Sequence, residues 1–141
     1  MTREIKLLNF NLTKINVEKN PDYKGQLSIK SNMKILSIEK YKIDLIKKES
    51  VKINFNFSIN YEELGLISLD GFFILLVDKK TFKELIEKWD SKDFNPDLRA
   101  SILNIIIQKS SIQALKIEEE IGLPLHIQMP QVNVEKKQES K

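Results

Sequence analysis

The strongest constraint on this chain is a strict alternation of apolar and polar residues over 51–61. Six apolar side chains occupy the odd positions, and lysine, asparagine or serine occupies every even position between them. Because successive side chains of a strand point to opposite faces, this pattern predicts a strand with one apolar and one polar face. After a short connection at 62–65, residues 67–77 repeat the apolar positions and complete a β-hairpin. Two strands do not cover their own apolar row, so another layer must pack on them.

Length and composition indicate one globular domain. The chain has 141 residues, enough for a core of its own, and its 41% hydrophobic and 30% charged residues argue against disorder. We assign the domain to residues 1–134 and a flexible charged tail to 135–141. The absence of cysteine excludes disulfides, thiol catalysis and thiolate metal sites. Neither a secretion signal nor a membrane span is recognisable, so we expect a soluble, cytoplasmic protein.

The first half of the chain predicts further strands. The apolar positions of residues 5–18 change from even to odd numbers near 13–14, which indicates a β-bulge in a strand. Residues 20–25 combine asparagine, proline, aspartate and glycine, as loops do. An extended pattern resumes over 27–35. We interpret residues 36–46 as a strand, although their spacing also tolerates a helix.

The second half predicts two helices. Asp78 can cap a short helix that runs through Trp89. A long helix follows Asn95, which is a suitable N-cap before proline, and it ends near residue 121, where Gly122 suits the left-handed position after a helix. The predicted apolar stripe of the long helix is wide, and its main members are Ile102, Ile105, Ile106, Ile112, Leu115 and Ile121.

Two further isoleucines widen this stripe beyond what one hairpin face requires. Ile107 and Ile117 lie at its margins and extend the apolar surface around the helix. A helix that is apolar on more than one side usually packs against two structural layers. We therefore expect a sheet on one side of the long helix and a second subunit on the other, with Ile107 and Ile117 as interface candidates.

Three short motifs stand in an order that matches one protein family. Residues 65–71 (GLISLDG) are similar to a Gly-Ile-Phe-x-Ile-x-Gly segment, and residues 96–102 (PDLRASI) to Pro-x-x-Arg-x-x-Ile. Residues 122–124 (GLP), followed by PQVN at 130–133, are similar to a Gly-x-Phe-Pro and Pro-Val-Asn ending. Across residues 13–134 the chain thus resembles the SecB-type export chaperones and their archaeal and toxin–antitoxin-associated relatives.

This resemblance implies a fold and a function. It implies an α+β fold, in which a short and a long helix pack on one face of a twisted four-stranded antiparallel sheet, and assembly as a dimer of dimers. It implies an ATP-independent holdase for non-native polypeptides, with no catalytic centre, cofactor or metal. Residues placed near the family's apolar grooves, or in the extended segment after the long helix, are the candidates for client contact: Tyr23, Trp89, Phe94, Leu123, Leu125, Ile127 and Met129. For Trp89 a core role, and for the extended segment a core or interface role, remain open.

The family's translocase-docking surface is poorly matched. It is acidic and includes a leucine, whereas Lys14, Ser58 and Asn60 stand at three of its positions here, and only Glu18 keeps the acidic character. Delivery to the translocase motor is therefore doubtful, while partnership with unfolded chains, or with one dedicated partner such as an antitoxin, is not affected.

The remaining polar residues favour structural roles. His126, the only histidine, has no further ligand at a useful spacing, so a packing or surface role outweighs a metal site. Glu118, Glu119 and Glu120 follow one another on the long helix and are interpreted as a solvated face. Glu62 and Glu63 are expected in an exposed turn.

An alternative function is a nucleic-acid-binding or adaptor module that uses a lysine-rich sheet face. The net charge of +3 comes from many lysines, which base composition of a genome can also explain. The expected polar strand face carries asparagine and serine in place of stacking aromatics, which argues against a platform for single-stranded nucleic acid. The lysines considered for this face are Lys6, Lys14, Lys30, Lys34, Lys42 and Lys52.

Overall fold

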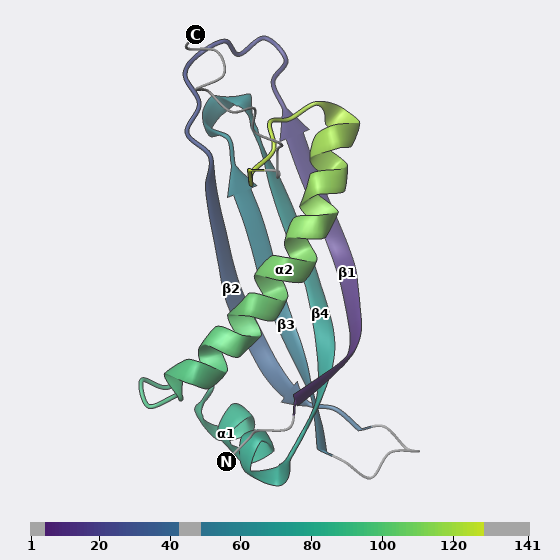
Figure 1. The fold of residues 1–141 in the computed structure, drawn as a ribbon, viewed down its shortest axis with the longest axis vertical. Coiled ribbons are helices and arrows are strands. Elements are labelled where there is room, and N and C mark those ends of the chain that lie inside the picture. Colours follow the sequence, from purple (N-terminus) through teal and green to yellow (C-terminus); the bar gives the residue numbers. More distant parts are fainter. Residues whose placement is uncertain (1–4, 43–48, 129–141) are drawn as a thin grey trace, which may run out of the picture.

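The structure, a computed structural model, describes residues 5–42 and 49–128. In this part of the chain four antiparallel strands form one sheet in the order β1-β4-β3-β2, and two helices lie on one face of it (Figure 1). This is the predicted α+β architecture. The elements are β1 (Ile5–Lys19), β2 (Lys30–Lys40), β3 (Glu49–Asn60), the short 3-10 helix η1 (Glu62–Leu64), β4 (Gly65–Val77), α1 (Lys79–Lys88) and α2 (Pro96–Ile121).

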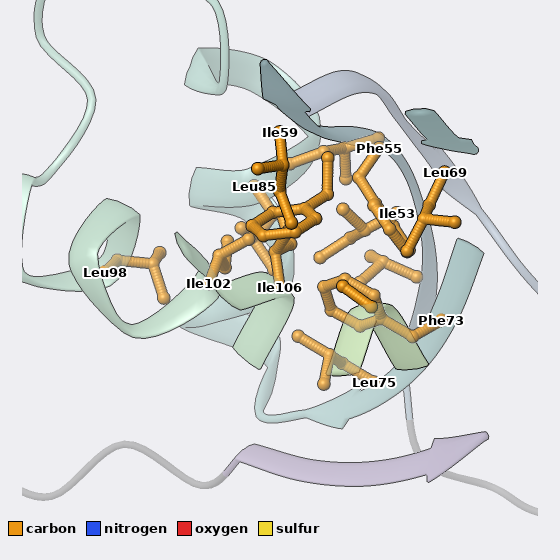
Figure 2. Close-up of a cluster of buried hydrophobic side chains, with 14 of the residues drawn as sticks. Ile53, Phe55, Ile59, Leu69, Phe73, Leu75, Leu85, Leu98, Ile102 and Ile106 are labelled. Carbon is orange, nitrogen blue, oxygen red and sulfur yellow. The ribbon is translucent and has the colours of Figure 1, made fainter. Parts of the chain in front are cut away.

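The central hairpin is formed by β3 and β4, as the alternation predicts. The odd-numbered side chains from Val51 to Tyr61 are all completely buried on the helix-covered face, whereas the even-numbered ones are half-buried or exposed on the other. Residues from β3, β4, α1 and α2 meet in a single core (Figure 2). The helices thus supply the covering layer that the hairpin needs.

Bulges in the two edge strands adjust which side chains face the core. The register of β1 against β4 shifts at Thr13, where the sequence predicts a bulge, and also at Leu8. The shift at Leu8 corrects the predicted alternation, which placed Leu8 on the same face as Phe10 and Leu12. Leu8 is displaced from the pairing with β4 and is 39% exposed. β2 has a similar shift at Leu36. Of the strand predicted over residues 36–46, residues 36–40 are strand, residues 41–42 are not, and residues 43–46 lie outside the described part.

Both helices begin where their caps were predicted. The Asp78 side chain accepts a hydrogen bond from the Thr81 backbone N–H (3.3 Å), and Asn95 accepts one from the Asp97 N–H (2.8 Å). At the end of α2, Gly122 has a left-handed backbone with φ 78°, and its N–H donates to the Glu118 carbonyl (2.9 Å).

The buried face of α2 follows every fourth residue instead of the straight stripe that we predicted. Successive residues of an α-helix are about 100° apart around its axis, so four residues make a full turn plus about 40°. A line that joins every fourth residue therefore winds slowly around the helix. This rotation matches the oblique path of α2 over the sheet in Figure 1. The buried line consists of Leu98, Ile102, Ile106, Ser110, Ala114 and Glu118.

The oblique path changes the roles of three isoleucines. Ile112 lies about 180° from the buried line and is 52% exposed, so its assignment to the core stripe is wrong. Ile107 and Ile117 lie about 90° from the line, on opposite flanks, and both pack partly buried against the core of their own chain. The extra width of the stripe therefore has an explanation within one subunit.

Candidate functional site

The most open apolar surface of the sheet lies along β1. Five of its side chains on the helix-covered face are half-buried, and the sixth, Ile15, is 55% exposed. Their partners on β4 and the neighbouring side chains of β3 are fully or almost fully buried on the same face. We call this surface the β1 strip, and it consists of Ile5, Leu7, Phe10, Leu12, Ile15 and Val17.

The position of α2 explains why the β1 strip stays open. In Figure 1, α2 begins outside β2 and crosses the sheet, and it reaches β1 only near the end of both elements. There the Lys19 ammonium donates a hydrogen bond to the Ile121 carbonyl (2.9 Å). Among the described elements, no helix covers most of β1, and its apolar residues lie open beside a closed core.

The β1 strip continues directly into that core through Phe10. Its ring lies 5.2 Å from the Phe55 ring and 6.2 Å from the Phe73 ring, measured between centroids. Gly71 makes this packing possible, because a Cβ there would lie 2.2 Å from the Asn11 carbonyl oxygen and 3.0 Å from the Phe55 ring. The strip is therefore the exposed margin of the core.

The client-contact candidates do not form one site. Trp89 is half-buried and Phe94 is buried beside the start of α2, where Arg99 lies 5.0 Å from the Phe94 ring. Tyr23, in the loop after β1, is half-buried and donates a hydrogen bond to the Gln26 carbonyl (2.8 Å).

The other candidates follow the far end of α2. Leu123 is buried, Leu125 is half-buried and Ile127 is 43% exposed, while Met129 lies outside the described residues. The 26 residues of α2 span about 39 Å, so the candidates fall into two separate groups. In this conformation Phe94 and Leu123 are not available to a partner.

The β1 strip is a feature that the sequence analysis did not single out. The change of register near 13–14 was recognised, but only pairing with β4 places Leu7 and Phe10 on one face across the bulge at Leu8. A signal was present in the run of apolar residues, since Ile5, Leu7 and Phe10 fit one face once a bulge is allowed between them.

The interpretation of Glu118 as part of a solvated helix face is wrong, because its side chain is completely buried. The Tyr61 hydroxyl donates a hydrogen bond to its carboxylate, and His126 Nδ1 lies 3.0 Å from Oε2. His126 Nε2 lies 3.0 Å from Ser111 Oγ. Burial, followed by the contact with Glu118, raises the pKa of Tyr61 well above its usual value, so the phenol stays protonated. The packing role expected for His126 fits this arrangement.

Ser111, His126 and Glu118 share the connectivity of a hydrolase triad. Such a site also needs an accessible nucleophile and donors for an oxyanion. Ser111 lies inside α2, where backbone N–H groups are used by the helix itself, and the His126 side chain is only 2% exposed. The geometry therefore fits a structural contact better than acyl transfer.

The opposite face of the sheet mixes both charges. Lys14 is paired in register with Asp70, and Lys52 with Glu39. The Lys52 ammonium lies 4.6 Å from the centre of the Phe72 ring. Glu18, the docking candidate, is exposed on β1 at the same face. The lysines considered for nucleic acid are exposed except Lys52, but acidic residues interrupt them, so the face is not a continuous basic surface.

Comparisons with known proteins place this fold. No protein-family model matches the chain, and no curated protein matches its sequence. Among solved structures, the SecB-like chaperone of Mycobacterium tuberculosis, in complex with a ChAD peptide from the HigA1 antitoxin, matches with a TM-score of 0.52 and 8% identity over 90% of both chains. A Streptococcus agalactiae protein of unknown function matches 92% of this chain and 99% of its own, with a TM-score of 0.47 and 12% identity.

The chain therefore has a SecB-like fold, as the three motifs indicated. It consists of one four-stranded antiparallel sheet with two helices on one face, within the part that the structure describes. Neither helix of this part combines the length and apolar character required to cross a membrane.

Proposed function

We propose that the chain is an ATP-independent holdase chaperone that binds non-native polypeptides along the β1 strip. The observation that carries this proposal is the contrast between β3, whose apolar face is closed, and β1, whose apolar face is open. Contiguous exposed apolar surface of this kind marks a place for a partner. The strip contains no catalytic group, and we propose no chemical step.

The position of β1 supports a mode of binding that tolerates different sequences. β1 has 15 residues and is an edge strand of the described sheet, so its outer backbone groups are free to pair with an extended segment. Main-chain hydrogen bonds do not depend on side chains, while the strip contacts the apolar residues of the segment. At about 3.4 Å per residue, β1 spans roughly 50 Å.

Two narrower forms of this function follow from the fold. One is a dedicated chaperone of a partner such as an antitoxin, which the antitoxin peptide bound to the Mycobacterium tuberculosis protein supports. The other is export from the cytoplasm, for which Glu18 alone of the expected docking residues is acidic. We favour the dedicated partner, acting as a homo-oligomer, over delivery to a translocase.

Suppression of aggregation tests the proposal. An unfolded model protein is diluted into buffer with an equimolar amount of the chain and without nucleotide, and light scattering is followed. We expect scattering to fall strongly and to be unaffected by added ATP. Undiminished aggregation at several-fold excess of the chain would contradict holdase function.

A further inference from the structure

The residues after α2 form a separate short segment that folds back over the sheet. We call residues 123–128 the strap, and Figure 1 shows it turning back from the upper end of α2. The Leu123 N–H donates to the Glu118 carbonyl (3.0 Å), next to the similar bond from Gly122. Leu123 is 4% exposed and Ile127 is 43% exposed, so the strap is inserted at its start and open at its end.

Beyond Leu123, the strap is held by side chains. Between described residues, the backbone of 124–128 makes no backbone–backbone hydrogen bond. The polar contacts are those of His126, whose Nδ1 reaches Glu118 and whose Nε2 reaches Ser111. We call this pair of contacts the clasp. A segment fixed by a few side chains opens at a lower free energy than a strand of the sheet does.

The clasp also satisfies a group that needs a partner. The Glu118 carboxylate is completely buried, and a buried carboxylate is costly unless it is hydrogen-bonded or paired. Tyr61 supplies one hydrogen bond and His126 supplies the contact with a group that can carry positive charge. Docking of the strap and burial of Glu118 are therefore linked.

The strap covers apolar surface of the central strand. The His126 ring meets the Phe57 ring edge-on with centroids 6.0 Å apart, and Tyr61 lies behind Glu118. Phe57 belongs to the helix-covered face of β3, Tyr61 follows directly after β3, and both side chains are completely buried. Release of the strap would bring water, or another apolar segment, to this end of the sheet.

We propose that the strap is a detachable cover, held by the clasp, that competes with client segments for the Phe57 end of the sheet. This inference rests on the proposed holdase function. It assigns an autoinhibitory role to Leu123 and His126, which are otherwise only packing residues. Opening of the strap would extend the client surface from β1 to the centre of the sheet.

Thiol labelling tests whether the clasp holds the strap. The chain has no cysteine, so a single Leu123→Cys substitution reports opening through its labelling rate. His126→Gln keeps an amide near the Nε2 position but loses the contact with Glu118, whereas His126→Asn keeps a donor near the Nδ1 position. We expect labelling at position 123 to accelerate about ten-fold with His126→Gln and much less with His126→Asn.

A second thiol separates strap opening from general unfolding. Leu98→Cys lies on the buried line at the other end of α2, and its labelling rate should be the same in all His126 backgrounds. An unchanged rate at position 123 would overturn the proposal. Equal acceleration at both positions would also overturn it, because the clasp would then support the whole fold.

Client binding tests the competition. The association rate of a fluorescent, permanently unfolded polypeptide should rise with His126→Gln and stay unchanged with Gln128→Ala, a control at an exposed polar position of the strap that leaves the clasp intact. If the wild-type chain binds but His126→Gln associates no faster, the strap does not compete and the inference fails. If no variant binds, the holdase proposal fails, whereas thiol labelling still reports on the clasp.

Discussion

Tyr61 and Glu118 form a hydrogen-bonded pair of completely buried side chains. The phenol and the carboxylate lie in contact inside the core, where neither is exposed to water. A carboxylate accepts this hydrogen bond only while the phenol keeps its proton, so the pair stabilises the protonated form of Tyr61. The same contact fixes the end of β3 to the last turns of α2.

The raised pKa of Tyr61 predicts a pH dependence of stability. In the unfolded chain a tyrosine loses its proton near pH 10, so the contribution of Tyr61 is complete below about pH 10 and is lost as the pH rises further. The free energy of unfolding should fall there by up to about 1.4 kcal/mol per pH unit. Urea unfolding between pH 8 and about pH 11 measures this slope.

Tyr61→Phe and Tyr41→Phe form the matched pair for this measurement. Tyr61→Phe should reduce stability at neutral pH by about 2 kcal/mol, because it removes a hydrogen bond to a buried charge, and it should flatten the alkaline slope. Tyr41 is exposed, so Tyr41→Phe should leave both unchanged. If the free energy of unfolding of Tyr61→Phe falls equally steeply above about pH 10, another titrating group causes the alkaline slope.

The burial of Glu118 could not be predicted from the sequence. Three consecutive glutamates suggest a solvated helix face, and the pattern carries no information on position 61, which is 57 residues away. Position 126 is close in sequence, but its contact depends on the reversal at Gly122. Long-range partners of single polar residues are invisible to local periodicity.

At the scale of elements, signals within a single segment were reliable. The β3–β4 alternation, the caps at Asp78 and Asn95 and the turn at Gly122 each depend on a few neighbouring residues, and each was confirmed. The bulge at Leu8 and the oblique path of α2 depend on the partner strand or layer, and those were missed. The open face of β1 was also missed, because it depends on where α2 crosses the sheet.

The N-cap of α2 gives a quantitative prediction at this scale. Asn95→Ala removes the acceptor for the Asp97 and Leu98 N–H groups and should reduce the free energy of unfolding by about 1 kcal/mol. Asn104→Ala, on the exposed side of the same helix, is the control and should change it by less than about 0.5 kcal/mol. Equal effects would mean that the cap does not contribute to stability. Chemical denaturation measures both.

At the scale of the whole molecule, exposed apolar side chains are spread over several elements. Seven large apolar side chains of the described part are at least 39% exposed, and they lie on both edge strands, on α2 and in connecting segments. These side chains are the surface that the proposed assembly and client binding would use. They are Leu8, Ile15, Leu27, Leu36, Tyr41, Ile112 and Ile127.

Solution mass tests the predicted assembly. A dimer of dimers of this 16.5 kDa chain should have a mass of about 66 kDa, four times that of the chain. Light scattering after size exclusion measures it. A mass of one chain at all concentrations would contradict the assembly and would leave Ile107 and Ile117 with their flanking contacts to the core alone.

The most direct test of the account is a binding titration without nucleotide, in which a labelled, permanently unfolded polypeptide is titrated with three forms of the chain. Ile15→Asp places a charge in the β1 strip, and Ile112→Asp places the same charge at a similarly exposed position on the far side of α2. We predict tight binding by the wild type and by Ile112→Asp, and affinity at least about ten-fold weaker for Ile15→Asp. Equal affinity of the two variants, or no binding by the wild type, would contradict the central claim that β1 holds the client.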